Sequence, residues 1–221
     1  MSNPAKTRLS LVVVIAFCAL ATAACQSVYY GTMEKLGYQK REILVNRVQE
    51  ARDAQQEAKT QYRSALEKFS EVVNYKGGEL EEQYKKLNSE YERCESKAKA
   101  VHDRIASVED VAKALFEEWQ EELKQYTNKD LKSASQKKLE ETRKRYQQLM
   151  KAMKRAEAKM DPVLSAFHDQ VLFLKHNLNA QAIASLHKGL TTVEMDVATL
   201  IKEMETSIAE ADRFIQGMGK E

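Results

Sequence analysis

A long heptad series of apolar and aromatic side chains constrains this chain more than any other feature. Alternating steps of four and three residues give the series Leu80, Tyr84, Leu87, Tyr91, Cys94, Ala98, Val101, Ile105, Val108, Ala112, Leu115 and Trp119. A period of 3.5 residues keeps such a stripe facing one direction only when the helix supercoils around a partner. The sequence therefore predicts a long helix that packs along its length against other helices.

Residues that break helices are scarce in the rest of the chain. Its 221 residues include 7 glycines and 2 prolines, and no glycine occurs between residues 79 and 188. Charged residues make up 31% of the chain and the mean hydropathy is −0.58. The apolar residues nevertheless recur with helical spacing, which is not the pattern of a disordered chain. We therefore predict an all-α fold.

The same periodicity predicts three to four long helices, arranged as an elongated antiparallel coiled-coil-like bundle over residues 33–217. The predicted helices are residues 33–75, 79–126, 129–178 with a kink at residue 162, and 182–216. Gly77 and Gly78 separate the first two helices, because glycine reaches the left-handed conformations that end helices. So short a break joins antiparallel neighbours.

Each of the other predicted helices has an apolar seam of its own. The first runs through Leu44, Val48, Ala51, Gln55, Ala58, Tyr62, Ala65, Phe69 and Val72. The third runs through Leu139, Thr142, Tyr146, Leu149, Met153, Ala156, Met160, Val163, Phe167, Val171, Leu174 and Leu178. The last runs through Ile183, Leu186, Leu190, Val193, Val197, Leu200, Met204, Ile208, Ala211 and Ile215.

Two positions in these seams leave alternatives open. Gln55 is the one polar residue in the first seam, and it either fixes the register of the bundle from a buried position or is partly exposed. Pro162 either kinks one long helix, which we favour, or opens a new helix with Asp161 as its cap.

The first 25 residues predict export and a lipid anchor. Lys6 and Arg8 precede an apolar run over residues 11–21, which is too short to span a bilayer. The small residues 22–24 followed by Cys25 resemble a bacterial lipobox, in which the cysteine is lipidated and becomes the mature N-terminus. We therefore predict a signal peptide over residues 1–24, and lipidated Cys25 with a tether over residues 25–32. The alternative is ordinary cleavage after residue 23 or 24, which gives a soluble secreted protein.

The lipobox resemblance also implies a location in the bacterial cell envelope. Gln26 stands where inner-membrane lipoproteins commonly carry aspartate, so the expected place is the periplasmic face of the outer membrane. The mature chain would keep 33 basic and 33 acidic residues, because the signal peptide removes only Lys6 and Arg8 from the 35 basic residues. This neutral balance gives no support to nucleic-acid binding.

The cysteine count excludes an intramolecular disulfide in such a mature protein. Cys18 would leave with the signal peptide and Cys25 would carry lipid, so Cys94 stands alone in its seam. We expect Cys94 to be buried as a small hydrophobic residue, rather than to serve a redox or intermolecular role.

Three stretches of the chain resemble a known family. They are residues 29–45 (YYGTMEKLGYQKREILV), 108–119 (VEDVAKALFEEW) and 171–183 (VLFLKHNLNAQAI). On these blocks the chain is similar to bacterial envelope lipoproteins that are grouped as a domain of unknown function and expected to be coiled coils. The resemblance implies no activity, cofactor or catalytic residue.

The sequence contains no motif that indicates catalysis. It has no glycine-rich phosphate loop, no HExxH, no CxxC and no GxSxG. His168, Asp169 and His176 lie within about two helical turns, but the Glu-x-x-His pairs of bundle iron sites are missing. We expect neither an enzyme nor a bound metal or cofactor.

The strongest charged feature is a basic cluster in the third predicted helix. Its members are Arg143, Lys144, Arg145, Lys151, Lys154, Arg155 and Lys159. We expect a solvated face paired with Glu117, Glu118, Glu121 and Glu122 of the preceding helix. A second interpretation is contact with anionic lipid headgroups or another acidic envelope polymer. The export signal argues against nucleic acid as the partner.

Two classes of function follow from these features. The favoured one is a lipid-anchored structural or adaptor protein that presents a helical bundle to a protein partner or to another copy of itself. The alternative is a carrier that binds a lipid or other apolar ligand between its helices near residues 163–178. A continuously filled seam would favour the adaptor, and a cavity of a few hundred cubic ångströms beside that stretch would favour the carrier.

Overall fold

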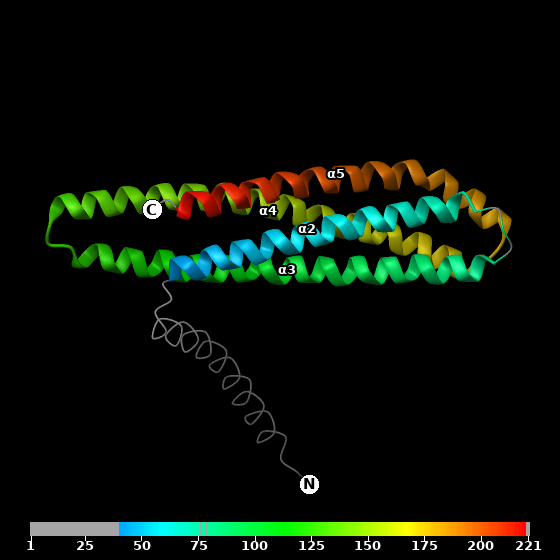
Figure 1. Ribbon diagram of the computed structural model, residues 1–221, viewed down its shortest axis with the longest axis horizontal. Coiled ribbons are helices and arrows are strands. Elements are labelled where there is room, and N and C mark those ends of the chain that lie inside the picture. The colour runs from blue at the N-terminus through cyan, green and yellow to red at the C-terminus, as the bar shows by residue number, and fades with distance from the viewer. Residues whose placement is uncertain (1–39, 76, 78, 220–221) are drawn as a thin grey trace, which may run out of the picture. The chain divides into compact units, whose positions relative to one another are not determined.

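The computed structural model describes residues 40–75, 77 and 79–219, which form four helices and no strand (Figure 1). The helices are α2 (Lys40–Val73), α3 (Leu80–Gln125), α4 (Lys129–His176) and α5 (Ala180–Gly219). The predicted all-α bundle is therefore confirmed. The predicted signal peptide, Cys25, the tether and the predicted helix start at residue 33 all lie outside the described residues.

From Leu44 onward the helices form one compact unit in which each is antiparallel to the next (Figure 1). The backbones of α4 and α5 lie side by side over the longest stretch, followed by those of α3 and α4. Side-chain pairs join α2 to the other two sides of the bundle. Arg104 of α3 donates to Glu50 at 2.7 Å, and Arg52 donates to Asp212 of α5 at 2.9 Å. The order around the bundle is thus α2, α3, α4, α5.

All four helices contribute buried side chains to the core of this unit, and the seams of α2 and α3 follow the prediction most closely. All nine predicted seam residues of α2 are buried, at 1% exposure or less. In α3 the predicted seam is buried from Leu87 onward except at Tyr91 and Trp119, which are half-buried. Phe69 of α2 meets Phe167 of α4 edge to face, with ring centroids 6.4 Å apart. Side chains from diagonal helices therefore meet at the centre, and burial of these seams supplies most of the stability.

Gln55 is one of the fully buried residues, at 0% exposure. The interpretation of a partly exposed amide is therefore wrong. Neither polar atom of this amide has a hydrogen-bond partner among the described residues, and the same holds for the buried hydroxyl of Ser207. Gln55 lies between Arg52 and Lys59 on α2, and Ser207 lies between Glu205 and Asp212 on α5. Arg52 pairs with Asp212 and Lys59 pairs with Glu205, so the two buried polar groups lie at the same level of the bundle.

The α4 helix runs through Pro162, so this residue does not open a new helix. Proline has no N–H for the helical ladder and crowds the carbonyl four residues earlier. Asp161, Pro162 and Ala158 are all exposed. Water can therefore hydrate the carbonyl that proline leaves without its usual donor, which makes the residue tolerable within one helix.

The predicted seams were wrong at the ends of α4 and α5. Leu178 follows the end of α4 and is 43% exposed, because the helix ends at His176 and Asn177 turns the chain. In the C-terminal half of α5, the buried series is Leu200, Met204, Ser207, Ala211, Phe214 and Met218. Ile208 and Ile215, which the prediction placed in the seam, are half-buried.

The connection between α3 and α4 is a short hairpin at one end of the bundle (Figure 1). The Asn128 side chain caps α4 by accepting hydrogen bonds from the backbone N–H groups of Asp130 and Leu131. Trp119 Nε1 donates to Ser135 Oγ at 2.9 Å and ties the two helices together. The described helices include none with the length and apolar character needed to cross a bilayer.

Candidate functional site: a cationic groove between α4 and α5

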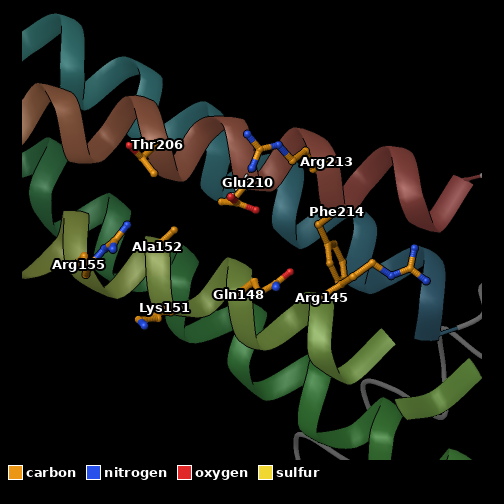
Figure 2. A pocket seen from close by; sticks show the side chains of 9 residues that line it. All are labelled: Arg145, Gln148, Lys151, Ala152, Arg155, Thr206, Glu210, Arg213 and Phe214. Carbon is orange, nitrogen blue, oxygen red and sulfur yellow. Dashed lines mark hydrogen bonds and ion pairs between the residues drawn. The ribbon is translucent and has the colours of Figure 1, made fainter. Parts of the chain in front are cut away.

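The surface between α4 and α5 is hollowed into a groove with a volume of about 490 Å³, called here the cationic groove (Figure 2). It is lined by Arg145, Gln148, Lys151, Ala152, Arg155, Thr206, Glu210, Arg213 and Phe214. Four of these nine side chains are basic and one is acidic. The groove therefore presents a positive rim to an incoming ligand.

Helical spacing places the rim residues in two rows. On α4, Arg145, Gln148, Lys151 and Arg155 follow one another at intervals of three or four residues and lie along one face. The row covers ten residue steps, or about 15 Å at 1.5 Å per residue. The facing row on α5 runs from Thr206 to Arg213, and Figure 2 shows the two rows on opposite sides of the groove.

The floor of the groove is apolar and closed. Ala152 and Phe214 are each 3% exposed, and the Phe214 ring reaches from α5 toward α4 (Figure 2). At one end of the groove, the Arg145 guanidinium occupies the space that a side chain at position 217 would need. A Cβ added to Gly217 would lie only 2.6 Å from Arg145 Nη1. The guanidinium thus lies against the last turns of α5, where the helix dipole favours a cation.

Acidic neighbours neutralise only part of this charge. Arg213 pairs with Glu210 one turn earlier on α5, and Arg155 Nε lies 3.3 Å from Glu203 Oε2. Lys151 is exposed and forms no ion pair with any described residue. The rim therefore keeps a net positive charge, and Lys151 is an exposed cation that no described acidic side chain neutralises.

The structure divides the predicted basic cluster between different faces of α4. Arg145, Lys151 and Arg155 line the cationic groove, whereas the exposed Lys144 and Lys159 do not. Lys154 instead faces α3. The seven residues that the sequence placed together therefore do not form one surface.

The partners of the basic side chains also differ from the prediction. Lys154 Nζ lies 3.0 Å from Glu109 and 3.2 Å from Glu157. Arg143 places its guanidinium carbon 5.3 Å from the centroid of the Phe116 ring, in cation–π geometry. The predicted pairing with the glutamates of residues 117–122 is wrong for Lys154 and Arg155. Phe116 of α3 contacts Arg143 and Tyr146 of α4. Because the two helices are antiparallel, the glutamates that follow Phe116 lie beside residues before Arg143, far along the helix from Lys154.

The α5 side of the groove was missed by sequence reasoning. Arg213 lies 68 residues after Arg145 in the chain, and no periodic pattern connects them. One signal was present, because Arg213 is one of only three basic residues between residues 182 and 216. Phe214 was missed because the predicted seam passed through Ile215 instead.

The comparison with known families identifies the chain. A family model described as a protein of unknown function (DUF2959) matches residues 29–218. The chain belongs to the DUF2959 family. No match was found among curated proteins.

A second hollow lies near the start of α3 in this DUF2959 chain. It has a volume of about 460 Å³ and is lined by Glu79, Leu80, Glu81, Glu82, Lys85 and Leu178. Lys85 pairs with Glu81 at 2.7 Å within α3. Its charges are thus largely acidic and partly satisfied locally, so we assign it no ligand.

The histidines do not gather into a metal centre. His168 packs against Tyr91 with ring centroids 5.4 Å apart, and its Nδ1 lies 4.0 Å from Asp169. His102 Nδ1 lies 2.8 Å from Glu157. Among the described residues, no three His, Cys, Asp or Glu side chains are grouped closely enough to hold a metal ion.

Proposed function

We propose that this DUF2959 protein is a lipid-anchored structural or adaptor module of the bacterial envelope, which acts through protein–protein contacts. One observation carries the proposal. The helices close on a continuous core, and between α4 and α5 the outer surface offers the cationic groove for recognition. Such a surface is suited to holding a partner.

The packing near the end of α4 favours this proposal over an apolar carrier. Val163, Phe167, Val171 and Leu174 are each 4% exposed or less. These side chains fill the stretch in which a carrier would need a cavity of several hundred cubic ångströms. The cationic groove has no lining residue in that stretch. The second hollow touches it only at Leu178, beside Leu80 and three glutamates, which is a largely acidic lining and not the apolar one that a lipid carrier needs.

The sequence before residue 40 supports the anchor. Cys25 follows small residues and an apolar run of signal-peptide length, as in lipoproteins. We propose that lipid on Cys25 holds the mature chain at the periplasmic face of the outer membrane. A single acyl chain gives only marginal membrane binding, so stable attachment needs more than one chain.

The anchor is tested by Cys25→Ser in the full chain. The substitution should abolish labelling by a fatty-acid analogue and release the protein from the membrane fraction. A wild-type protein that takes up no label and stays with membranes after the substitution would contradict the anchor.

The adaptor role is tested separately, by chemical crosslinking in intact cells followed by purification of the full chain. We expect a defined protein to be crosslinked at a reproducible stoichiometry. Recovery of the chain alone, or with a stoichiometric apolar ligand and no protein, would contradict the adaptor role.

A further inference from the structure

We propose that the cationic groove docks an acidic amphipathic helix of a partner protein. The inference rests on the proposed adaptor function and names the chemistry of the partner. Its carboxylates would meet the basic rim, and small residues on the same side would lie over the closed floor at Ala152 and Phe214.

The shape of the groove suits a helix. Two neighbouring helices of a bundle present ridges of side chains at intervals of three and four residues, and a further helix packs into the channel between such ridges. The α4 row from Arg145 to Arg155 spans about 15 Å, which is the length of a ten-residue helix. The floor between the rows is apolar and closed, with Ala152 and Phe214 each 3% exposed. A helix with small or aliphatic residues on one face would therefore cover it.

The positive charges of the rim require acidic residues on both sides of the partner helix where it faces the groove. A partner that covers the groove removes water from Lys151 and Arg155, and a cation that loses water without gaining a counter-charge is strongly unfavourable. Lys151 forms no ion pair within the described residues, and Arg155 has only the 3.3 Å contact with Glu203. Carboxylates spaced three or four residues apart on the partner would match the α4 row.

Three other occupants fit less well. The acyl chain of an anionic lipid needs an open apolar slot, whereas Ala152 and Phe214 are each 3% exposed and close the floor. The chain's own residues 26–39 contain one acid, Glu34, and one base, Lys35, so they cannot neutralise the rim. In a second copy, the acidic stretch at residues 117–122 has Trp119 as its apolar residue, and Trp119 is already tied to Ser135.

Two adjacent glutamines provide a matched test in the full chain within intact cells. Gln148 lines the groove and Gln147, also exposed, does not. A photo-crosslinking amino acid at position 148 should capture a partner protein, and the same group at position 147 should capture at least about tenfold less. Mass spectrometry of the crosslinked peptide should find a segment with apolar residues at helical spacing flanked by Asp or Glu.

Charge reversal tests the assignment of the rim. Lys151→Glu with Arg155→Glu should lower the crosslinking at position 148 by about tenfold or more, because like charges would then face each other. Lys144→Glu with Lys159→Glu changes the same net charge on the same helix outside the groove and should leave the yield unchanged. Lys substitutions of the captured acidic residues should restore crosslinking to the reversed groove.

Four results would overturn the inference. They are equal capture at positions 147 and 148, capture of an anionic lipid, capture of a second copy of this chain, and a captured segment without acidic residues. A protein crosslinked from other surfaces but absent at position 148 would defeat the docking site and leave the adaptor function standing. No protein partner from any surface would defeat both.

Discussion

Lys154 Nζ on α4 lies 3.0 Å from Glu109 Oε2 on α3, and this contact separates Lys154 from its basic neighbours. Glu157, one turn later on α4, lies 3.2 Å from the same ammonium. Partial burial alone would lower the pKa of Lys154, but hydrogen bonds to Glu109 and Glu157 outweigh it and raise the pKa. Lys151, only three residues earlier, instead lines the cationic groove. Residues of one basic cluster in the sequence therefore have different roles. Lys154 forms ion pairs where α4 packs on α3, and Lys151 contributes an unpaired charge to the cationic groove.

Charge reversal should therefore affect stability differently at these two positions. Lys154→Glu places a third acid beside Glu109 and Glu157 and should lower the free energy of unfolding by about 1 kcal/mol, since exposed ion pairs are individually weak. Lys151→Glu should change it by less than about 0.5 kcal/mol. Urea unfolding followed by circular dichroism measures both. Equal losses would mean that the groove residue is also structural.

The buried seam of α3 should tolerate no charge. Ile105 is 0% exposed and Leu87 is 1% exposed, so Ile105→Asp or Leu87→Asp would remove core packing and bury an unpaired carboxylate. We expect each to cost about 4 kcal/mol or more. Ser96→Asp adds the same charge at an exposed position of α3 and serves as the control. Melting curves for the seam variants that match the control would refute the core assignment.

The sequence predicted the α2 seam residue by residue, because burial on one side of a long helix repeats with the helix's own period. The last turns of α5 show the limit of this rule. Phe214 and Ile215 are both apolar and adjacent, and the pattern of α5 alone does not decide which one faces the core. The choice depends on the neighbouring helix, since Phe214 packs at the level of Arg145 and Gln148 of α4.

The cationic groove was unpredictable for a related reason. Its two rims come from helices whose relative register depends on how their buried side chains pack against each other. Neither helix encodes this register in its own periodicity. The sequence therefore named Arg145, Lys151 and Arg155 of the α4 row, within a larger basic cluster, and none of the α5 row.

The buried amide of Gln55 should lower the free energy of unfolding of the bundle, because a polar group without a hydrogen-bond partner is unfavourable in the core. Its amide is fully buried and has no hydrogen-bond partner among the described residues. Gln55→Met keeps the length of the side chain and removes both polar groups, so it should raise the free energy of unfolding by about 1–3 kcal/mol. Gln56→Met changes the adjacent exposed glutamine and should have little effect. A loss of stability in Gln55→Met would show that the amide is satisfied in solution.

Cys94 should react slowly in the folded protein. Burial raises the pKa of its thiol to about 12, and the thiol lies 3.7 Å from the backbone carbonyl oxygen of Gln61, to which it donates. Because the thiolate is the reactive form, alkylation of Cys94 at pH 8 should require unfolding of the bundle. Mass spectrometry of iodoacetamide-treated protein, with and without denaturant, measures this. Rapid alkylation of Cys94 in protein that keeps full helicity would show that the seam opens locally.

Alkaline pH should weaken the bundle through Tyr146. Its ring packs against Phe116 with centroids 5.4 Å apart, and burial, followed by the nearby Glu109 and Asp110, raises the pKa of its hydroxyl to about 12 from an ordinary value of 10. The folded protein thus holds this proton to higher pH than the unfolded chain does. The associated stability is complete below pH 10 and is lost as the pH rises toward 12, with a limiting slope of about 1.4 kcal/mol per pH unit for one proton.

Tyr146→Phe isolates this contribution, because it keeps the ring and removes the ionisable group. Urea unfolding at intervals between pH 8 and 12 should show a shallower decline above pH 10 for the variant than for the wild type, and parallel curves below pH 9. Lysine deprotonation in the same range acts on both proteins alike and cancels in the comparison. If the two curves stay parallel up to pH 12, the Tyr146 hydroxyl is hydrated in the folded protein and its ring alone contributes to the packing of α3 against α4.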